Sequence, residues 1–181
     1  MTYIAPLNLN ETDAAVAATL TAVKAKIGMI PNLYSTLAKS PTAFNGYMQL
    51  NQINTSGNLS ASEREIIALA SSQANSCHYC LSAHTLMGKG AGLTQEQMLN
   101  ARAGHGSTPR DAAIAAFAKA LVESRGHVEP AILDQFKADG LSEADLLEII
   151  GNVVAMTFSN YANNIARTAI DFPVVEVKLP A

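Results

Sequence analysis

The chain has 181 residues, of which 49% are hydrophobic and 15% are charged, with a formal net charge of −3. This length predicts a single domain over residues 1–181. The negative charge argues against nucleic acid and anionic membrane surfaces as partners, since both attract basic proteins. Low charge combined with many small apolar side chains favours self-association, so a homo-oligomer is expected.

No targeting or membrane segment is expected. Residues 1–16 lack the basic start and the continuous apolar core of a secretory signal. The longest apolar stretch, residues 146–156, is interrupted by polar residues and is too short to span a bilayer. A cytoplasmic location is therefore the expectation. In that reducing compartment, paired cysteines are more often catalytic or metal-binding than a structural disulfide.

Helix signals recur along the chain and strand signals are nearly absent, which predicts an all-α fold. Apolar residues at helical spacing predict a first helix over 12–27 that ends at Gly28. Pro31 and Pro41 are typical of first helical positions, and they predict a short helix through residue 37 and a longer one through residue 53.

Three later helices are indicated by capping boxes, in which a Ser or Thr is followed three residues later by an acidic or amide side chain. The pairs are Ser60 with Glu63, Thr94 with Gln97, and Ser142 with Asp145. Pro109 and Pro130 predict two further helix starts. The C-terminal helices are therefore expected over about 109–168. Only residues 174–177 alternate like a strand, and we interpret them as an extended tail.

The most informative segment is Cys-His-Tyr-Cys at residues 77–80, which contains the only two cysteines. The helix that starts at residue 61 is expected to end near residue 75. The next helix is expected to begin near residue 76, with residue 75 or 76 as its cap. Cys77, Cys80 and His84 then share one helix face, within an arc of about 60°. Two thiols and a neighbouring base are the groups that reversible disulfide chemistry requires.

The start of a helix favours a thiolate, because free N–H groups and the positive end of the helix dipole stabilise negative charge. His84, one turn beyond Cys80, is suited to hydrogen-bond that sulfur or to take its proton near neutral pH. Glu65 lies on the preceding helix. If the two helices pack as a hairpin, its carboxylate can orient His84 or hold a water that passes protons to Cys77.

Zinc is the main alternative for these residues. Cys77, Cys80, His84 and Glu65 have the donor atoms for four ligands, but structural zinc sites usually have a second Cys or His pair, which this sequence lacks. A c-type haem is disfavoured because Leu81, not His, follows the second cysteine. We therefore expect redox chemistry with no metal and no organic cofactor.

Other polar features receive structural interpretations. Residues 88–92 are glycine-rich but fit a helix C-cap better than a phosphate loop. His105 and His127 lie beside glycines and are expected to be exposed bystanders. The cluster Asn160, Asn163 and Asn164 is interpreted as a solvated face, with a role at the site or at a subunit interface left open. A shift of 83 residues, which aligns the two cysteines with Asn160 and Asn163, is a weak sign of an internal repeat.

The spacing Glu65-x11-Cys77-x2-Cys80-x3-His84 resembles the signature of the AhpD-like alkylhydroperoxidases, within the carboxymuconolactone decarboxylase superfamily. The segments 28–33 (Gly-Met-Ile-Pro-Asn-Leu) and 38–41 (Ala-Lys-Ser-Pro) also resemble the N-terminal part of its peroxidase-related branch. The resemblance covers a redox core over about 28–92, and the remaining chain only through its helical content.

This resemblance implies an AhpD-like helical fold, with the cysteine pair at the N-terminus of a core helix, that assembles as trimers or hexamers. It also implies reduction of a small hydroperoxide. Cys80 attacks the O–O bond and becomes a sulfenic acid, and Cys77 condenses with it to a disulfide. A dithiol reductant, such as a lipoyl or thioredoxin-like protein, then reduces that disulfide. The matching positions make His84 the base or hydrogen-bond partner and Glu65 part of the proton relay.

Two points of this assignment are open at the level of sequence. In thioredoxin-like motifs the first cysteine is usually the nucleophile, which favours Cys77, whereas the spacing to His84 favours Cys80; we adopt Cys80. The best-known family members carry His directly before the second cysteine, where this chain has Tyr79. A phenol with a pKa near 10 does not shuttle protons as imidazole does. The departure predicts weak peroxidase activity or a different oxidant.

Two other functions are alternatives. One is a decarboxylase of the same superfamily acting on a muconolactone-type acid, against which the presence of the cysteine pair counts. The other is a redox-sensing module, whose disulfide changes the oligomer without turnover.

Overall fold

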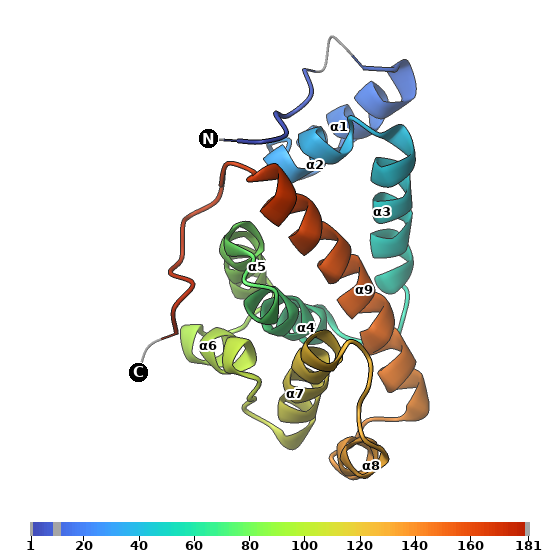
Figure 1. Cartoon of the computed structure of the whole chain (residues 1–181), viewed down its shortest axis with the longest axis vertical. Helices are drawn as coiled ribbons and strands as arrows, with labels where there is room; N and C mark the ends of the chain where they lie inside the picture. Colours follow the sequence, from blue (N-terminus) through green and yellow to red (C-terminus); the bar gives the residue numbers. More distant parts are fainter. Residues whose placement is uncertain (1, 9–11, 180–181) are drawn as a thin grey trace.

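The computed structural model describes residues 2–8 and 12–179 of the chain. Within them the chain forms nine helices and no strand, so the predicted all-α fold is confirmed (Figure 1). The helices are α1 (Ala14–Ile27), α2 (Asn32–Leu37), α3 (Pro41–Asn54), α4 (Ala61–Ala74), α5 (His78–Gly90), α6 (Gln95–Ala103), α7 (Pro109–Ser124), α8 (Pro130–Ala138) and α9 (Glu143–Ala166).

Helix α4 lies at the centre of the molecule, in contact with α5, α6, α7 and α9. Its residues from Ile66 to Ser72 are all buried, because α5, α6, α7 and α9 pack against it. The long helix α9 crosses the molecule, and it contacts α2 and α3 as well as α4 and α7 (Figure 1). Helix α5, which follows the first cysteine, packs against both α4 and α9.

Two hydrophobic clusters fill the interior. The larger one surrounds Leu69, Ile114 and Phe117, with side chains from α4, α6, α7 and α9. The smaller one contains Leu20 and Phe44, with side chains from α1, α2 and α3, and both cysteines. The two sulfur atoms are therefore held in an apolar layer beneath the N-terminal helices.

The sequence signals place most helix boundaries correctly. All three capping boxes form: at α4, for example, the Ser60 hydroxyl accepts from the Glu63 N–H at 3.2 Å, and the Glu63 carboxylate accepts from the Ser60 N–H at 2.7 Å. Gly28 ends α1 with φ of 84°, a left-handed conformation that favours glycine. Pro31 is the N-cap of α2 rather than its first residue, a difference of one position.

The segment after α9 runs back along α5 toward α6 (Figure 1) and forms no strand, as the extended-tail interpretation predicts. Arg102, buried on α6, donates to the main-chain oxygens of Glu176 and Val177 at 2.7 and 2.9 Å. The His78 ring, at the start of α5, is hydrogen-bonded to the Val175 oxygen at 2.6 Å. The tail therefore covers part of the helix that carries Cys80.

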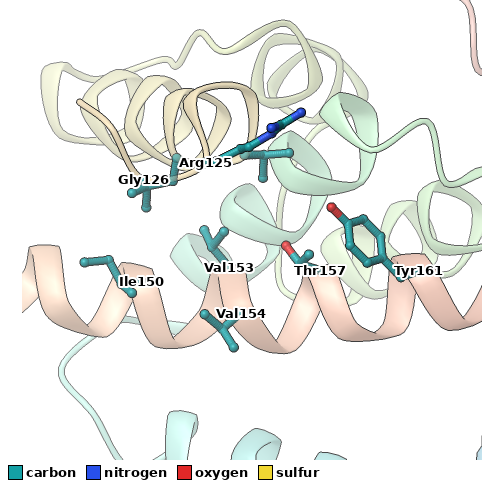
Figure 2. Close-up of a pocket in the computed structure, with 9 residues that line it drawn as sticks. Arg125, Gly126, Ile150, Val153, Val154, Thr157 and Tyr161 are labelled. Carbon is teal, nitrogen blue, oxygen red and sulfur yellow. The ribbon is translucent and has the colours of Figure 1, made fainter. Parts of the chain in front are cut away.

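Helix α9 carries a stripe of exposed apolar side chains, formed by Leu147, Ile150, Val154, Phe158, Tyr161 and Ile165. Part of this stripe lines a pocket of about 270 Å³ with the end of α7, and Figure 2 shows Arg125 and Gly126 across from α9. Neither cysteine lines this pocket. Within the described part of the chain, no helix combines the length and the hydropathy needed to cross a membrane.

An ion cluster joins the starts of three helices. Arg110 Nε on α7 lies 2.6 Å from a Glu63 oxygen on α4, and its Nη2 lies 2.9 Å from an Asp145 oxygen on α9. The hydrogen-bonded Arg110 guanidinium holds the pKa of the Asp145 carboxyl far below its ordinary value. Both carboxylates also complete capping boxes. One arginine therefore fixes how α4, α7 and α9 meet.

Replacing Arg110 by Ala is expected to lower the free energy of unfolding by about 2–3 kcal/mol, since it leaves two mostly buried carboxylates unpaired. We place the effect below that of fully buried pairs because the Arg110 side chain is 35% exposed. The folded-state pKa of Asp145 is lowered, so its contribution is complete above its ordinary pKa of 3.8 and is lost as the pH falls further. Chemical denaturation over a falling pH series measures both effects. The free energy of unfolding should decrease less steeply with falling pH in Arg110→Ala than in the wild type.

The matched control is Lys137→Ala, which breaks the exposed pair between Lys137 and Glu143 and should leave stability unchanged. An Arg110→Ala protein as stable as the wild type would contradict the role assigned to the cluster.

Candidate redox site

A tight turn between α4 and α5 positions the first cysteine. Ser76 adopts a left-handed conformation with φ of 51°, and the Cys77 N–H donates to the Ser72 oxygen at 2.9 Å. Cys77 is itself the N-cap of α5, because its sulfur accepts from the Cys80 N–H at 3.4 Å. The expected cap at residue 75 or 76 is therefore wrong. Residue 75 ends α4 and residue 76 has positive φ, so neither has the extended backbone of an N-cap.

Both cysteines are reduced and buried, with Cys77 0% and Cys80 2% exposed. Cys80 occupies the third position of α5, so the prediction that the pair lies at the N-terminus of a core helix is confirmed. The two thiols are close enough to interact as hydrogen-bond partners. Their proximity meets the first requirement for a reversible disulfide.

Glu65 and His84 meet across the hairpin of α4 and α5. Glu65 Oε2 lies 2.7 Å from His84 Nδ1, and their side chains are only 13% and 15% exposed. Burial acts to lower the pKa of His84, but the Glu65 carboxylate and the charge of Cys80 outweigh it and raise the pKa overall. The imidazole is thus held by Glu65, and its positive form is stabilised next to Cys80.

The two thiols differ in how readily they ionise. Burial alone would raise the pKa of Cys80, but its interactions with the Cys77 thiol and the His84 charge oppose burial. With hydrogen bonds from two asparagines, these interactions lower the pKa of Cys80 to about 6. The hydrogen bond with Cys80 and burial both raise the pKa of Cys77 far above its ordinary value. These interactions therefore favour a thiolate on Cys80 over one on Cys77.

The two asparagines come from α9. Asn163 Nδ2 donates to Cys80 Sγ at 3.2 Å, and Asn160 is completely buried and donates to the Ser72 hydroxyl at 3.2 Å. The interpretation of a solvated face is wrong for both residues and right only for Asn164, which is exposed. The reason is that α9 packs this face against α5, so amides that look like surface residues hydrogen-bond within the site.

A sequence signal for these asparagines was available. The shift of 83 residues aligns Cys77 with Asn160 and Cys80 with Asn163. In the structure, the aligned pair Cys80 and Asn163 are direct hydrogen-bond partners, and Asn160 lies beside both thiols. The two segments that resemble each other in sequence are therefore packed against each other.

Tyr79 and His78 lie between the cysteines in sequence but outside the Glu65–His84 contact. The Tyr79 hydroxyl accepts from the Leu33 N–H at 3.2 Å, and its ring packs edge-on against Phe172. Burial raises the pKa of Tyr79 further above its ordinary value of 10.0. These contacts make Tyr79 a packing residue, and the His78 ring is hydrogen-bonded to the C-terminal tail.

Two histidines and the glycine-rich segment behave as expected from the sequence. His105 and His127 are exposed, and residues 88–92 form the end of α5 and the turn after it, with Gly92 at φ of 92°. Among residues 2–8 and 12–179, no group of three or more His, Cys, Asp or Glu side chains is arranged to hold a metal ion.

The reduced protein is expected to show one thiolate that titrates near pH 6, far below the ordinary thiol pKa of 9.0. Ultraviolet thiolate absorbance measured across a pH series gives this midpoint directly. His84→Gln should raise the midpoint, because it removes the positive charge that favours the Cys80 thiolate. The exposed His105→Gln is the matched control and should leave it unchanged. A wild-type midpoint near 9 would contradict the assigned thiolate.

Comparison with known families places the site in context. Residues 41–123 match the model of the carboxymuconolactone decarboxylase family, and this segment contains Glu65, both cysteines and His84. No curated protein is significantly similar to this chain in sequence.

Several solved structures share the fold. The alkylhydroperoxidase AhpD core protein of Ralstonia eutropha, a peroxidase-related protein, is 22% identical with a TM-score of 0.85, over 94% of this chain and 92% of that chain. The debrominase Bmp8, solved as a cysteine-to-alanine variant with 2,3,4-tribromopyrrole, is 20% identical with a TM-score of 0.79, over 94% and 92%. A peroxidase-related protein of a Silicibacter species is 20% identical with a TM-score of 0.79, over 92% and 91%.

At these identities the likeness to solved structures establishes the fold, while the family match covers the segment with the candidate site. Residues 41–123, which contain the candidate site, therefore match the carboxymuconolactone decarboxylase family, and the chain has the AhpD core fold.

Proposed function

We propose that this protein is a thiol-dependent hydroperoxide reductase, with Cys80 as the nucleophile and Cys77 as the resolving thiol. The observation that carries the proposal is the pair of buried cysteines at the start of α5, in which Cys80 accepts a hydrogen bond from Asn163 near an imidazole held by Glu65. The fold likeness to peroxidase-related proteins supports it. A dithiol protein is the reductant that the cycle needs.

The first step oxidises Cys80. Its thiolate attacks the terminal oxygen of the hydroperoxide, the O–O bond breaks, and the sulfur becomes a sulfenic acid. The alkoxide that leaves takes a proton from the His84 imidazolium and departs as an alcohol. Glu65 stabilises the imidazolium before this transfer, which is why a buried histidine can serve as the acid.

The second step forms the disulfide. Once Cys80 is a sulfenic acid, the thiolate that raises the pKa of Cys77 no longer exists, so Cys77 ionises more readily. Its sulfur attacks the Cys80 sulfur, and hydroxide leaves as water with the proton that Cys77 releases. An external dithiol then transfers two electrons and two protons to the disulfide, and both thiols are restored.

The direct test is hydroperoxide consumption with dihydrolipoamide or dithiothreitol as the dithiol. The proposal predicts catalytic consumption, with one dithiol oxidised for each peroxide reduced. Oxidation of the protein without turnover would indicate the redox-sensing module instead. Activity on a muconolactone-type acid that persists without the cysteines would indicate the decarboxylase.

A second electrophile fits the same thiolate, and the fold likeness to the debrominase Bmp8 favours it as an alternative substrate class. The Cys80 thiolate would take the bromine of a bromopyrrole, while the ring carbon gains a proton. Cys77 would then displace bromide and form the same disulfide. Bromide release from 2,3,4-tribromopyrrole, measured beside peroxide consumption, decides between the two electrophiles.

We also propose a homo-oligomer, a trimer or hexamer as the family resemblance implies, that buries the α9 stripe. Six large apolar side chains on this helix are 39–70% exposed in the single chain. Multi-angle light scattering should give an assembly larger than a monomer, and Val154→Asp should reduce its size. Ile132→Asp, at an exposed apolar position on α8, is the control. A monomeric wild type would contradict this proposal.

A further inference from the structure

A pocket of about 260 Å³ opens near Cys80, between the start of α5 and the end of α9. We call it the α5–α9 pocket; it is lined by Ser76, His78, Asn163, Arg167, Thr168 and Ile170, among others. Asn163 both lines this pocket and donates to Cys80 Sγ at 3.2 Å. The Asn163 side chain therefore connects the pocket to the Cys80 sulfur. Its volume lies below the roughly 300–1,000 Å³ of drug-sized sites, so its ligand is small.

Two oxygen atoms of the lining are buried without a hydrogen-bond partner in the described part of the protein. They are Asn163 Oδ1 and Thr168 Oγ1, on side chains that are 3% and 8% exposed. Buried polar atoms are nearly always satisfied, so orphaned ones in a pocket point to a ligand. Asn163 Nδ2 faces the thiolate, so Oδ1 is left as an acceptor for a ligand O–H. The Thr168 hydroxyl can donate or accept.

The electrostatics of the pocket favour an anion. It lies between the N-terminus of α5, whose first-turn N–H groups attract negative charge, and the C-terminus of α9, whose dipole acts in the opposite direction, so the charged side chain in the lining decides the preference. Arg167, exposed at the end of α9, adds a full positive charge, and no carboxylate of the described residues pairs with it. The nearby Asp171 does not line the pocket and accepts from the Asn32 N–H at 2.7 Å.

We propose that the α5–α9 pocket binds a small organic hydroperoxide that carries a carboxylate. Arg167 pairs with the carboxylate, and Asn163 Oδ1 accepts the hydrogen bond of the terminal O–H, which brings that oxygen toward Cys80. The Thr168 hydroxyl donates to the inner peroxide oxygen, which becomes the alkoxide. This inference rests on the proposed peroxidase function and names its substrate class.

The kinetic test compares β-hydroperoxyisovalerate with its methyl ester, which lacks the negative charge. Arg167→Ala should lower kcat/KM for the acid about tenfold and leave the ester nearly unchanged. Arg125→Ala is the matched control, because Arg125 also ends its helix as an exposed arginine in a left-handed conformation, but lines the pocket between α7 and α9. Equal losses for acid and ester, or no preference for the acid in the wild type, would overturn the assignment.

A binding test separates the pocket from the chemistry. Calorimetry should detect β-hydroxyisovalerate binding to the wild type, about tenfold weaker binding to Arg167→Ala, and about fivefold weaker binding to Thr168→Val. Thr168→Val should not lower Tm, because it removes a hydroxyl that has no partner in the folded protein. A merely structural role for Thr168 predicts the opposite, a lower Tm with unchanged binding.

The two tests together distinguish the possible failures. If β-hydroxyisovalerate binds in an Arg167-dependent manner but no peroxide is consumed, the pocket assignment holds and the proposed function is wrong. If peroxides are consumed while neither Arg167→Ala nor Thr168→Val changes binding, the pocket assignment is wrong and the proposed function holds.

Discussion

Cys80→Ser is expected to abolish peroxide turnover, with a loss of at least about a thousandfold, because a hydroxyl does not ionise near neutral pH and cannot become a sulfenic acid. Cys77→Ser is expected to stop steady-state turnover but to retain one round of peroxide reduction. In that variant the Cys80 thiolate still reacts, but no second thiol resolves the product. Peroxide consumption in the presence and absence of a dithiol measures both effects.

A sulfenic-acid probe identifies the nucleophile in the same pair of variants. After one equivalent of peroxide, Cys77→Ser should be labelled at Cys80 and Cys80→Ser should remain unlabelled. Cys77→Ser should preserve the start of α5, because Cys77 is the N-cap of this helix and serine is a favourable N-cap residue. Labelling of Cys80→Ser alone would transfer the nucleophile role to Cys77.

Loss of the imidazole at position 84 is expected to have the second largest effect. His84→Gln should lower kcat/KM at neutral pH by about a hundredfold, since it removes both the charge that stabilises the Cys80 thiolate and the acid that protonates the leaving alkoxide. Glu65→Gln should cost less, about tenfold, because an amide still contacts the ring but does not stabilise its positive form.

The pH dependence of kcat/KM separates these roles from a purely structural defect. In the wild type the rate should rise as the pH increases through about 6, because Cys80 must lose its proton to react. In His84→Gln this rise should move toward the ordinary thiol pKa of 9.0. The double variant Glu65→Gln/His84→Gln should lose little more kcat/KM than His84→Gln alone, since Glu65 acts through the histidine. His127→Gln, at an exposed position, is the control. An unchanged profile in His84→Gln would contradict the assigned thiolate and imidazolium pair.

Local sequence signals were sufficient for the helices, because capping residues, prolines and glycines act within one or two turns. Ser60 with Glu63 forms the predicted capping box, and Gly28 ends α1 where expected. The same local reasoning failed at α5. Ser76 is a favourable cap residue by type, but its left-handed backbone makes it part of the turn, and the less usual Cys77 caps the helix instead.

The site depended on tertiary packing to a different degree at each residue. The i, i+3 spacing placed the cysteines together within one helix, so their proximity could be predicted. The contact of Glu65 with His84 required α4 and α5 to pack as a hairpin. The sequence did not establish that packing, so the contact could be predicted only if the hairpin formed. Asn163 could not be assigned from its own helix, because its burial depends on how α9 packs against α5.

The most direct test of the redox pair is stoichiometric oxidation of the fully reduced wild-type protein. After one equivalent of hydroperoxide per chain, thiol titration and peptide mass mapping should find both thiols lost and Cys77 joined to Cys80 within the same chain. Two thiols that survive, or a cysteine that is overoxidised while its neighbour stays reduced, would contradict the account.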